Sequence, residues 1–114
     1  MSLSADRAEL AQILSTIDGV SGFAYRPKIM SSGNAWPLLG PLERGPADDY
    51  LATWRVVIIL PTDERKASDW FANHLEDITD ALDQFSYVER IEPYAVQTEG
   101  GDVNAMLLTM NKEA

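Results

Sequence analysis

YLATWRVVIIL, residues 50–60, is the stretch that decides the fold. It begins with apolar and polar side chains in alternation and ends as a continuous run of β-branched and aliphatic residues. Such a run is typical of a strand that is buried on both faces. Pro61, which cannot continue a sheet ladder, follows directly. We therefore expect residues 50–60 to form a central strand of the sheet.

The segment after this strand predicts a long amphipathic helix over residues 63–85. Thr62 can cap its start, and the acidic residues Asp63 and Glu64 suit the positive end of the helix dipole. Apolar residues recur at helical spacing along one face: Ala67, Trp70, Phe71, Leu75, Ile78, Ala81, Leu82 and Phe85. The opposite face is rich in acidic residues.

The flanking segments add one more helix and three more strands. Upstream, residues 4–17 have the apolar spacing of a helix with Ser4 as its cap, and residues 20–27 alternate as a half-buried strand does. Downstream, residues 87–98 read as a strand in which Pro93 indicates an edge position or a bulge. A turn at residues 99–102 then leads into a last strand at residues 103–110.

This order of elements predicts an α+β fold: a mainly antiparallel four-stranded sheet with two helices packed on one face. At 114 residues and 12.6 kDa, the chain has the size of one domain, residues 1–114. Its hydrophobic fraction of 46% is that of a chain that folds. Without cysteine, the domain has no disulfides and depends on packing.

Charge and hydropathy narrow the functional classes. Eighteen acidic residues against nine basic ones give a formal charge of −9, which repels a phosphate backbone, so we expect no specific binding of nucleic acid. The N-terminal residues do not have the pattern of a signal peptide, and the longest apolar run is far shorter than a membrane span of about 20 residues. We therefore expect a soluble protein without a membrane partner.

No motif in the sequence predicts catalysis. His74, the only histidine, lies on the apolar face of the second predicted helix, where a packed histidine is the ordinary interpretation. Glu76, Asp77, Asp80 and Asp83 lie on the outer face of the same helix and are interpreted as a solvated surface. Phosphate-binding glycine motifs are absent. The sequence thus names no catalytic, cofactor-binding or metal-binding residue, and we expect the protein not to be an enzyme.

The segment at residues 28–49 is expected to be an irregular loop that serves assembly. Its part SSGNAWPLLGPLERG holds Trp36, Leu38, Leu39 and Leu42 among glycine, proline and serine. Ordering some fifteen residues costs about 15 kcal/mol, whereas burying four such side chains returns about 9 kcal/mol. These side chains therefore complete the core or lie against another subunit.

The second face of the sheet favours the subunit contact. The strand at residues 56–60 and the last strand are apolar on both faces, yet two helices cover only one face. A second copy of the chain, held by the loop, would cover the other. The residues expected at this interface are Trp36, Pro37, Leu38, Leu39, Leu42, Tyr50 and Trp54.

The sequence resembles the tail terminator proteins of long-tailed bacteriophages, particularly those of actinobacterial phages. The resemblance lies in the helix ADRAELAQIL, the strand GVSGFAYRP, the loop GNAWP, the strand WRVVIILP with the helix behind it, and the hairpin YAVQTEGGDVNAMLLTM. It covers nearly the whole chain and includes no catalytic signature.

The resemblance implies a structural role in the virion. Proteins of this family form a ring, usually of six subunits, that caps the tail tube, ends its polymerisation and offers a surface to the head-tail connector. They have no enzymatic activity and no cofactor. DNA passes through such a ring without specific binding, which an acidic lumen favours. Candidates for that lining are Glu89, Glu92, Glu99 and Asp102, although ordinary solubility charge is the slightly favoured interpretation of these four.

Two alternatives stay open at this stage. The first is another protein of the same virion: a neck or head-completion protein, or a tail-tube subunit. The second is a small cytoplasmic ligand-binding module of ferredoxin-like build, in which Trp54, Trp70 and His74 would line a pocket.

Overall fold

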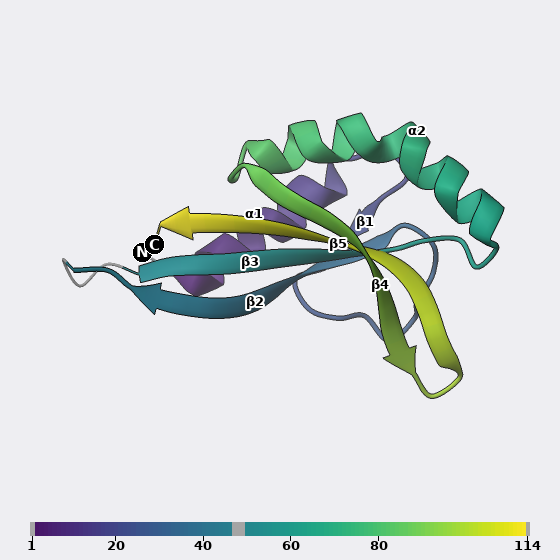
Figure 1. Cartoon of the computed structure of the whole chain (residues 1–114), viewed down its shortest axis with the longest axis horizontal. Helices are drawn as coiled ribbons and strands as arrows, with labels where there is room; N and C mark the ends of the chain where they lie inside the picture. The colour runs from purple at the N-terminus through teal and green to yellow at the C-terminus, as the bar shows by residue number, and fades with distance from the viewer. Residues whose placement is uncertain (1, 47–49, 114) are drawn as a thin grey trace.

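The computed structural model describes residues 2–46 and 50–113, which form two helices and a five-stranded sheet (Figure 1). In chain order the elements are α1 (Leu3–Ser15), β1 (Ser21–Gly22), β2 (Asn34–Arg44), β3 (Tyr50–Ile59), α2 (Glu64–Asp83), β4 (Val88–Thr98) and β5 (Gly101–Glu113).

The sheet has the strand order β1-β2-β3-β5-β4, and β3 lies at its centre. β1 pairs with β2 in parallel, and all other neighbours are antiparallel. The α+β class is therefore confirmed, whereas the expected four-stranded antiparallel sheet is a five-stranded mixed one. β3 carries the strand that we expected at residues 50–60, because Val56, Val57, Ile58 and Ile59 are all fully buried.

Both helices lie close to their expected places but begin with other caps. The side chain of Ser2, not Ser4, accepts a hydrogen bond from the amide of Ala5 and caps α1. At α2 the cap is Asp63 rather than Thr62, and it accepts from the amide of Lys66 at 3.1 Å. A carboxylate at this position also suits the helix dipole.

The expected loop at residues 28–49 is largely wrong, because residues 34–44 form the strand β2. The segment pairs with β3 through the registers Trp36 to Val57 and Leu39 to Trp54, with a shift between Leu39 and Leu42. Proline and glycine are tolerated here because β2 has a neighbour on its outer side only at β1. The expected strand at residues 20–27 shrinks to the two residues of β1. Residues 47–49 of the loop lie outside the described part.

The helix-side core lies between the sheet and both helices. Ile58 and Leu108 of the sheet meet Leu14 of α1 and Leu82 of α2, and all four side chains are fully buried. α1 and α2 thus cover the same face of the sheet, as expected.

A second cluster lies on the opposite face of the sheet. It consists of Trp36, Val57, Ile59, Val96, Ala105 and Leu107. Met30 packs against it from the segment at residues 23–33, here called the strap, which crosses this face on its way from β1 to β2 (Figure 1). Trp36 is only 2% exposed. The strap-side cluster is therefore closed by the chain itself, and the expectation that a second copy must cover this face is wrong.

Prolines and arginines protect both edges of the sheet, which are formed by β4 on one side and by β2, beyond its short pairing with β1, on the other. Pro93 lies in β4, which is the outer strand as its proline predicts. The carbonyl of Gln97, also in β4, points outward and accepts from Nη2 of Arg26 at 2.7 Å. On the other side, the outward carbonyl of Pro37 accepts from Nη1 of Arg7 at 3.1 Å. Pro41 also lies in β2, so both edges are poor partners for a further strand.

Candidate functional site

The end of the sheet formed by β2 and the start of β3 carries large apolar side chains that are exposed on both faces of the sheet. This end is here called the apolar arm: Leu39, Leu42 and Tyr50 lie on the helix side, and Leu38 and Leu51 lie on the strap side. Each of the five is between 36% and 44% exposed. Apolar side chains that gather on a surface mark contact sites more often than isolated ones do.

The structure divides the residues that the sequence assigned to a subunit interface. Leu38, Leu39, Leu42 and Tyr50 are exposed on the arm, Leu38 on the strap side of the sheet and the other three on the helix side. Trp36, Pro37 and Trp54 are buried within the chain, which places them in the core and leaves no side-chain surface for a partner. The interface expected from the sequence did not include Leu51. Its position next to the buried Ala52 nevertheless places its side chain on the opposite face of the strand.

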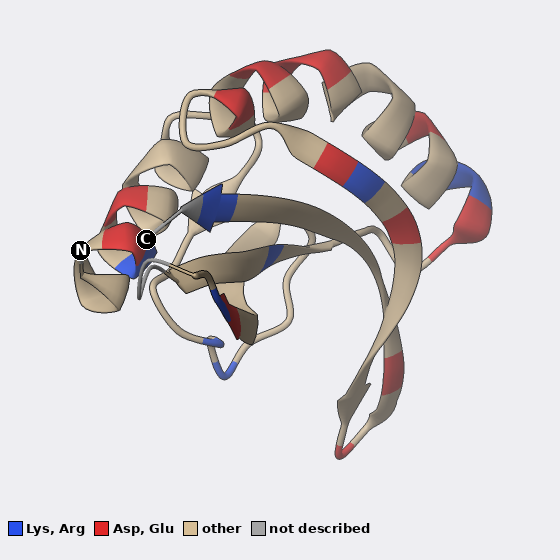
Figure 2. Cartoon of the chain, turned by 60° about the vertical axis from the view of Figure 1, so that its left-hand side comes forward, with Lys and Arg blue, Asp and Glu red and all other residues tan. Residues whose placement is uncertain are grey.

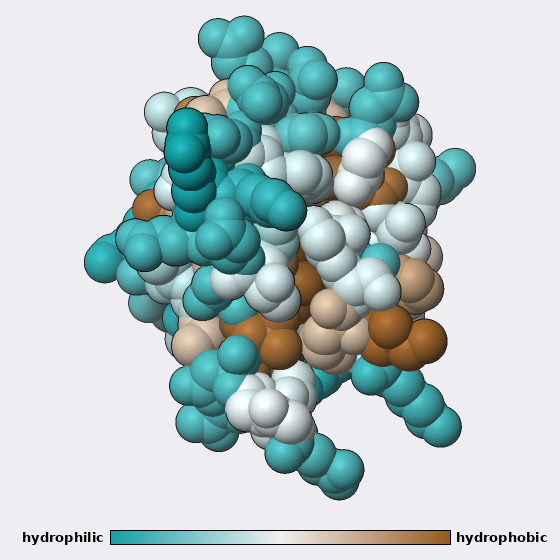
Figure 3. All heavy atoms as spheres, turned by 90° about the vertical axis from the view of Figure 1, so that its right-hand side faces the viewer, coloured by the Kyte–Doolittle hydropathy of each residue, from teal (hydrophilic) through white to brown (hydrophobic). Residues whose placement is uncertain are grey.

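A groove runs between the first half of α2 and the middle of β4 and β5. Its volume is about 940 Å³, and most of its lining is apolar. Phe71 and Leu75 of α2 form one wall, and Pro93, Tyr94 and Met106 of the hairpin form the other. Figure 3 shows this end of the molecule, where apolar side chains gather in patches among hydrophilic ones. The alternation of β4 and β5 did not reveal this groove, because it depends on how α2 lies over the hairpin.

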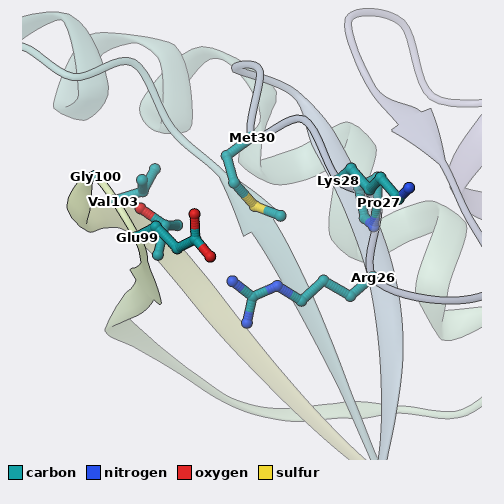
Figure 4. A pocket seen from close by; sticks show the side chains of 8 residues that line it. Arg26, Pro27, Lys28, Met30, Glu99, Gly100 and Val103 are labelled. Carbon is teal, nitrogen blue, oxygen red and sulfur yellow. The ribbon is translucent and has the colours of Figure 1, made fainter.

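A second hollow, of about 720 Å³, lies between the strap and the tip of the β4–β5 hairpin (Figure 4). Arg26 and Lys28 line it from the strap, and Glu99 and Val103 line it from the hairpin. Figure 4 shows the guanidinium group of Arg26 extending toward the hairpin, beside Met30. The strap holds two basic residues and no acidic one, in a chain of charge −9.

The four candidate lumen residues do not form one patch. Glu99 and Asp102 are exposed at the hairpin tip, whereas Glu89 and Glu92 lie farther along β4. Glu92 pairs with Arg90 at 3.3 Å, and Glu89 accepts a hydrogen bond from the side-chain amide of Asn111. Figure 2 shows acidic residues along β4 and at the hairpin tip, and further acidic residues along α2.

The imidazole ring of His74 is packed against its neighbours. Its ring stacks on Trp70 at 4.0 Å between centroids, and its Nδ1 donates to the carbonyl of Trp70 at 2.6 Å. The ring also lies against Gly19, where an added Cβ would come within 2.9 Å of Nε2. Trp54 is fully buried beneath the helices. None of Trp54, Trp70 and His74 lines the two hollows described above.

Within residues 2–46 and 50–113, no group of three or more histidine, aspartate or glutamate side chains could hold a metal ion. In the same residues no polar or charged side chain is buried. Neither helix is long and apolar enough to cross a bilayer.

No known family model matches the chain, and no curated protein matches it significantly. We therefore infer function from the surfaces of the chain and from the resemblance of its sequence.

Proposed function

We propose that the protein is a structural subunit of a bacteriophage tail, of the tail terminator type. Copies of it form a ring that caps the tail tube, ends its polymerisation and joins the tail to the head connector. The proposal assigns no catalysis and no cofactor to the chain and locates it in the virion. The observation that carries the proposal is the apolar arm.

The arm supports assembly because the chain does not need it for its own core. Both faces of the sheet are already closed, one by the helices and the other by the strap. The arm nevertheless keeps Leu42 and Tyr50 more than two-fifths exposed. Apolar surface that remains exposed after both cores are complete is best explained by a partner. The basis for the proposed assembly is therefore the arm, and not an uncovered sheet face or Trp36.

The charge of the chain suits a ring through which DNA slides. At −9 per copy, six copies carry a charge of about −54, and a surface of this sign repels phosphates. Glu99 and Asp102 are exposed at the hairpin tip and are the best placed of the four candidate lumen residues, because Glu92 pairs with Arg90 and Glu89 accepts from Asn111. DNA is thus expected to pass without specific binding.

Light scattering after gel filtration, with electron microscopy of the same fractions, tests the proposal. We expect an oligomer that appears as a closed annulus. Double substitution of Leu42 and Tyr50 by serine is expected to shift the material toward the monomer without unfolding it. Replacing the exposed Gln12 of α1 by serine is the matched control. Open-ended tubes would indicate a tail-tube subunit instead, and a monomer at every concentration would contradict a ring that forms by itself.

A ligand-binding module is the second candidate, and the hollow beneath the strap favours it. Arg26 and Lys28 bring two positive charges to this concave surface, against the single carboxylate of Glu99. Such a hollow suits a small anion, such as a carboxylate or a phosphate ester. Thermal-shift measurements with both classes of compound test this candidate. It requires a rise in melting temperature that is lost when Arg26 and Lys28 are both replaced by glutamine.

A further inference from the structure

We infer that the apolar arm of one copy lies in the groove between α2 and β4 of the next copy. This inference rests on the proposed function, because it describes how copies of the chain contact one another in the ring. It names both halves of a head-to-tail contact, whereas the proposed function requires only that the arm meets a partner.

The two surfaces lie toward opposite ends of the molecule. The arm is at one end of the longest axis, beside both chain ends, and the groove is at the half that contains the start of α2 and the bend of β4 and β5 (Figure 1). The molecule measures 47 × 30 × 21 Å along its principal axes. Contacts between two different patches of a subunit generate a ring when the rotation closes and a filament when it does not.

The arm and the groove match in chemistry and in size. Large side chains such as Phe71, Leu75 and Met106 are half-buried in the groove and leave apolar surface in its walls. The five arm side chains, at about two-fifths exposure, present roughly 400 Å² of surface over the two faces of the arm, taking about 200 Å² for each fully exposed side chain. A stable interface buries about 800 Å² per partner, so the arm would supply its apolar centre.

The prolines in the outer strands indicate that this contact is made by side chains and not by backbone pairing. Pro37 and Pro41 in β2 and Pro93 in β4 remove amide donors that a strand from a neighbouring copy would need. An arm that enters a groove does not need those donors.

Cysteine cross-linking tests the contact directly, because the natural chain has no cysteine. Two single-cysteine proteins, Leu42→Cys and Ala72→Cys, are purified separately, mixed and oxidised. Leu42 is 44% exposed on the arm, and Ala72 is exposed on the groove side of α2, so neither substitution disturbs the core. We expect the mixed disulfide to form at least tenfold faster than in a mixture of Leu42→Cys with Asp77→Cys, an exposed position of α2 that does not line the groove.

The outcomes separate this inference from the proposed function. An oligomer that forms without preferential linkage of residues 42 and 72 overturns the groove as the seat of the arm and leaves the ring intact. Preferential linkage of residue 42 to residue 42 would show a two-fold contact between arms and also overturns the inference. A monomer without any linkage contradicts both.

A blocking substitution gives a second, independent readout. Ala72→Arg places a long charged side chain at the groove, and we expect at least a tenfold weaker self-association. Asn73→Arg, the next exposed position along α2, adds the same charge outside the groove lining and should leave the association within twofold of the natural chain. Equal weakening by both variants would mean that charge alone, and not the groove, is responsible.

Discussion

The helix-side core and the strap-side cluster are built from the same strands but are closed by different means. On one face of β3, Val56 and Ile58 are covered by two long helices. On the other face, Val57 and Ile59 are equally buried, yet their cover is an eleven-residue strap without regular structure and the β4–β5 hairpin. A sheet that is apolar on both faces can therefore be completed by a single chain with only two helices.

The difference between the two covers lies in what holds each in place. The helices are held by many apolar side chains, which give a stabilisation that is spread over the whole face. The strap contributes Met30 to the cluster and is otherwise held by single hydrogen bonds. Side chains of Arg7, Arg26 and Asn34 link it to the rest of the chain, and the backbone groups of Phe23 and Gly33 bond to neighbouring strands. Three predictions follow from this contrast.

The largest expected effect is a paired truncation on opposite faces of one strand. Ile58→Ala removes a fully buried side chain from the helix-side core, and we expect it to lower the free energy of unfolding by about 4 kcal/mol. Ile59→Ala removes the same group from the strap-side cluster, where the strap can settle into the cavity, so we expect a loss of about 2–3 kcal/mol. Urea unfolding of both variants measures the difference. A loss below about 1 kcal/mol for Ile59→Ala would show that the strap does not seal this face in solution.

The second effect concerns the point where the strap joins β2. Gly33 has φ of +89°, and a Cβ there would lie 2.3 Å from the carbonyl oxygen of Gly19. We therefore expect Gly33→Ala to destabilise the fold by about 3 kcal/mol. Gly101→Ala is the control, since Gly101 has φ of +113° but no atom within 4 Å of the added group, and its expected cost is about 1 kcal/mol. Equal melting temperatures for the two variants would remove the close backbone approach from the explanation.

The smallest effect concerns the link between the strap and the hairpin. Arg26→Ala removes the hydrogen bond from Arg26 to the carbonyl of Gln97, at a cost of about 1 kcal/mol. Amide hydrogen exchange in residues 26–33 is expected to accelerate while exchange in α2 stays as it is, because the strap opens locally. Lys28→Ala, at a neighbouring strap position whose side chain lines the hollow, should leave the exchange unchanged. Acceleration in α2 as well would show that strap and helices open together.

The strand and helix positions were predictable where the periodic pattern is long. β3, α2 and the β4–β5 hairpin lie within a few residues of their expected places. β2 was not predictable, because its three proline and glycine residues, Pro37, Gly40 and Pro41, indicate a loop when read locally. The long pairing of β2 with β3 overrides that local preference, and an outer strand tolerates missing donors.

The candidate site was predictable only in part, for the same reason. The sequence shows that Leu38, Leu39 and Leu42 are apolar, but only the pairing of β2 tells that they are exposed while Trp36 is buried. The strap explains why the reasoning about an uncovered face failed, since nothing in its composition shows that it turns back over the sheet. The groove depends on the placement of α2 over the hairpin, which no single segment encodes.

The prolines and arginines on the two outer strands also bear on how the protein behaves at high concentration. Pro37, Pro41 and Pro93 interrupt each rim, and the outward carbonyls of Pro37 and Gln97 are already engaged. Two copies therefore cannot zip their sheets into one continuous ribbon, which is the route to amyloid-like fibres. Growth without limit through backbone pairing is therefore disfavoured for this chain.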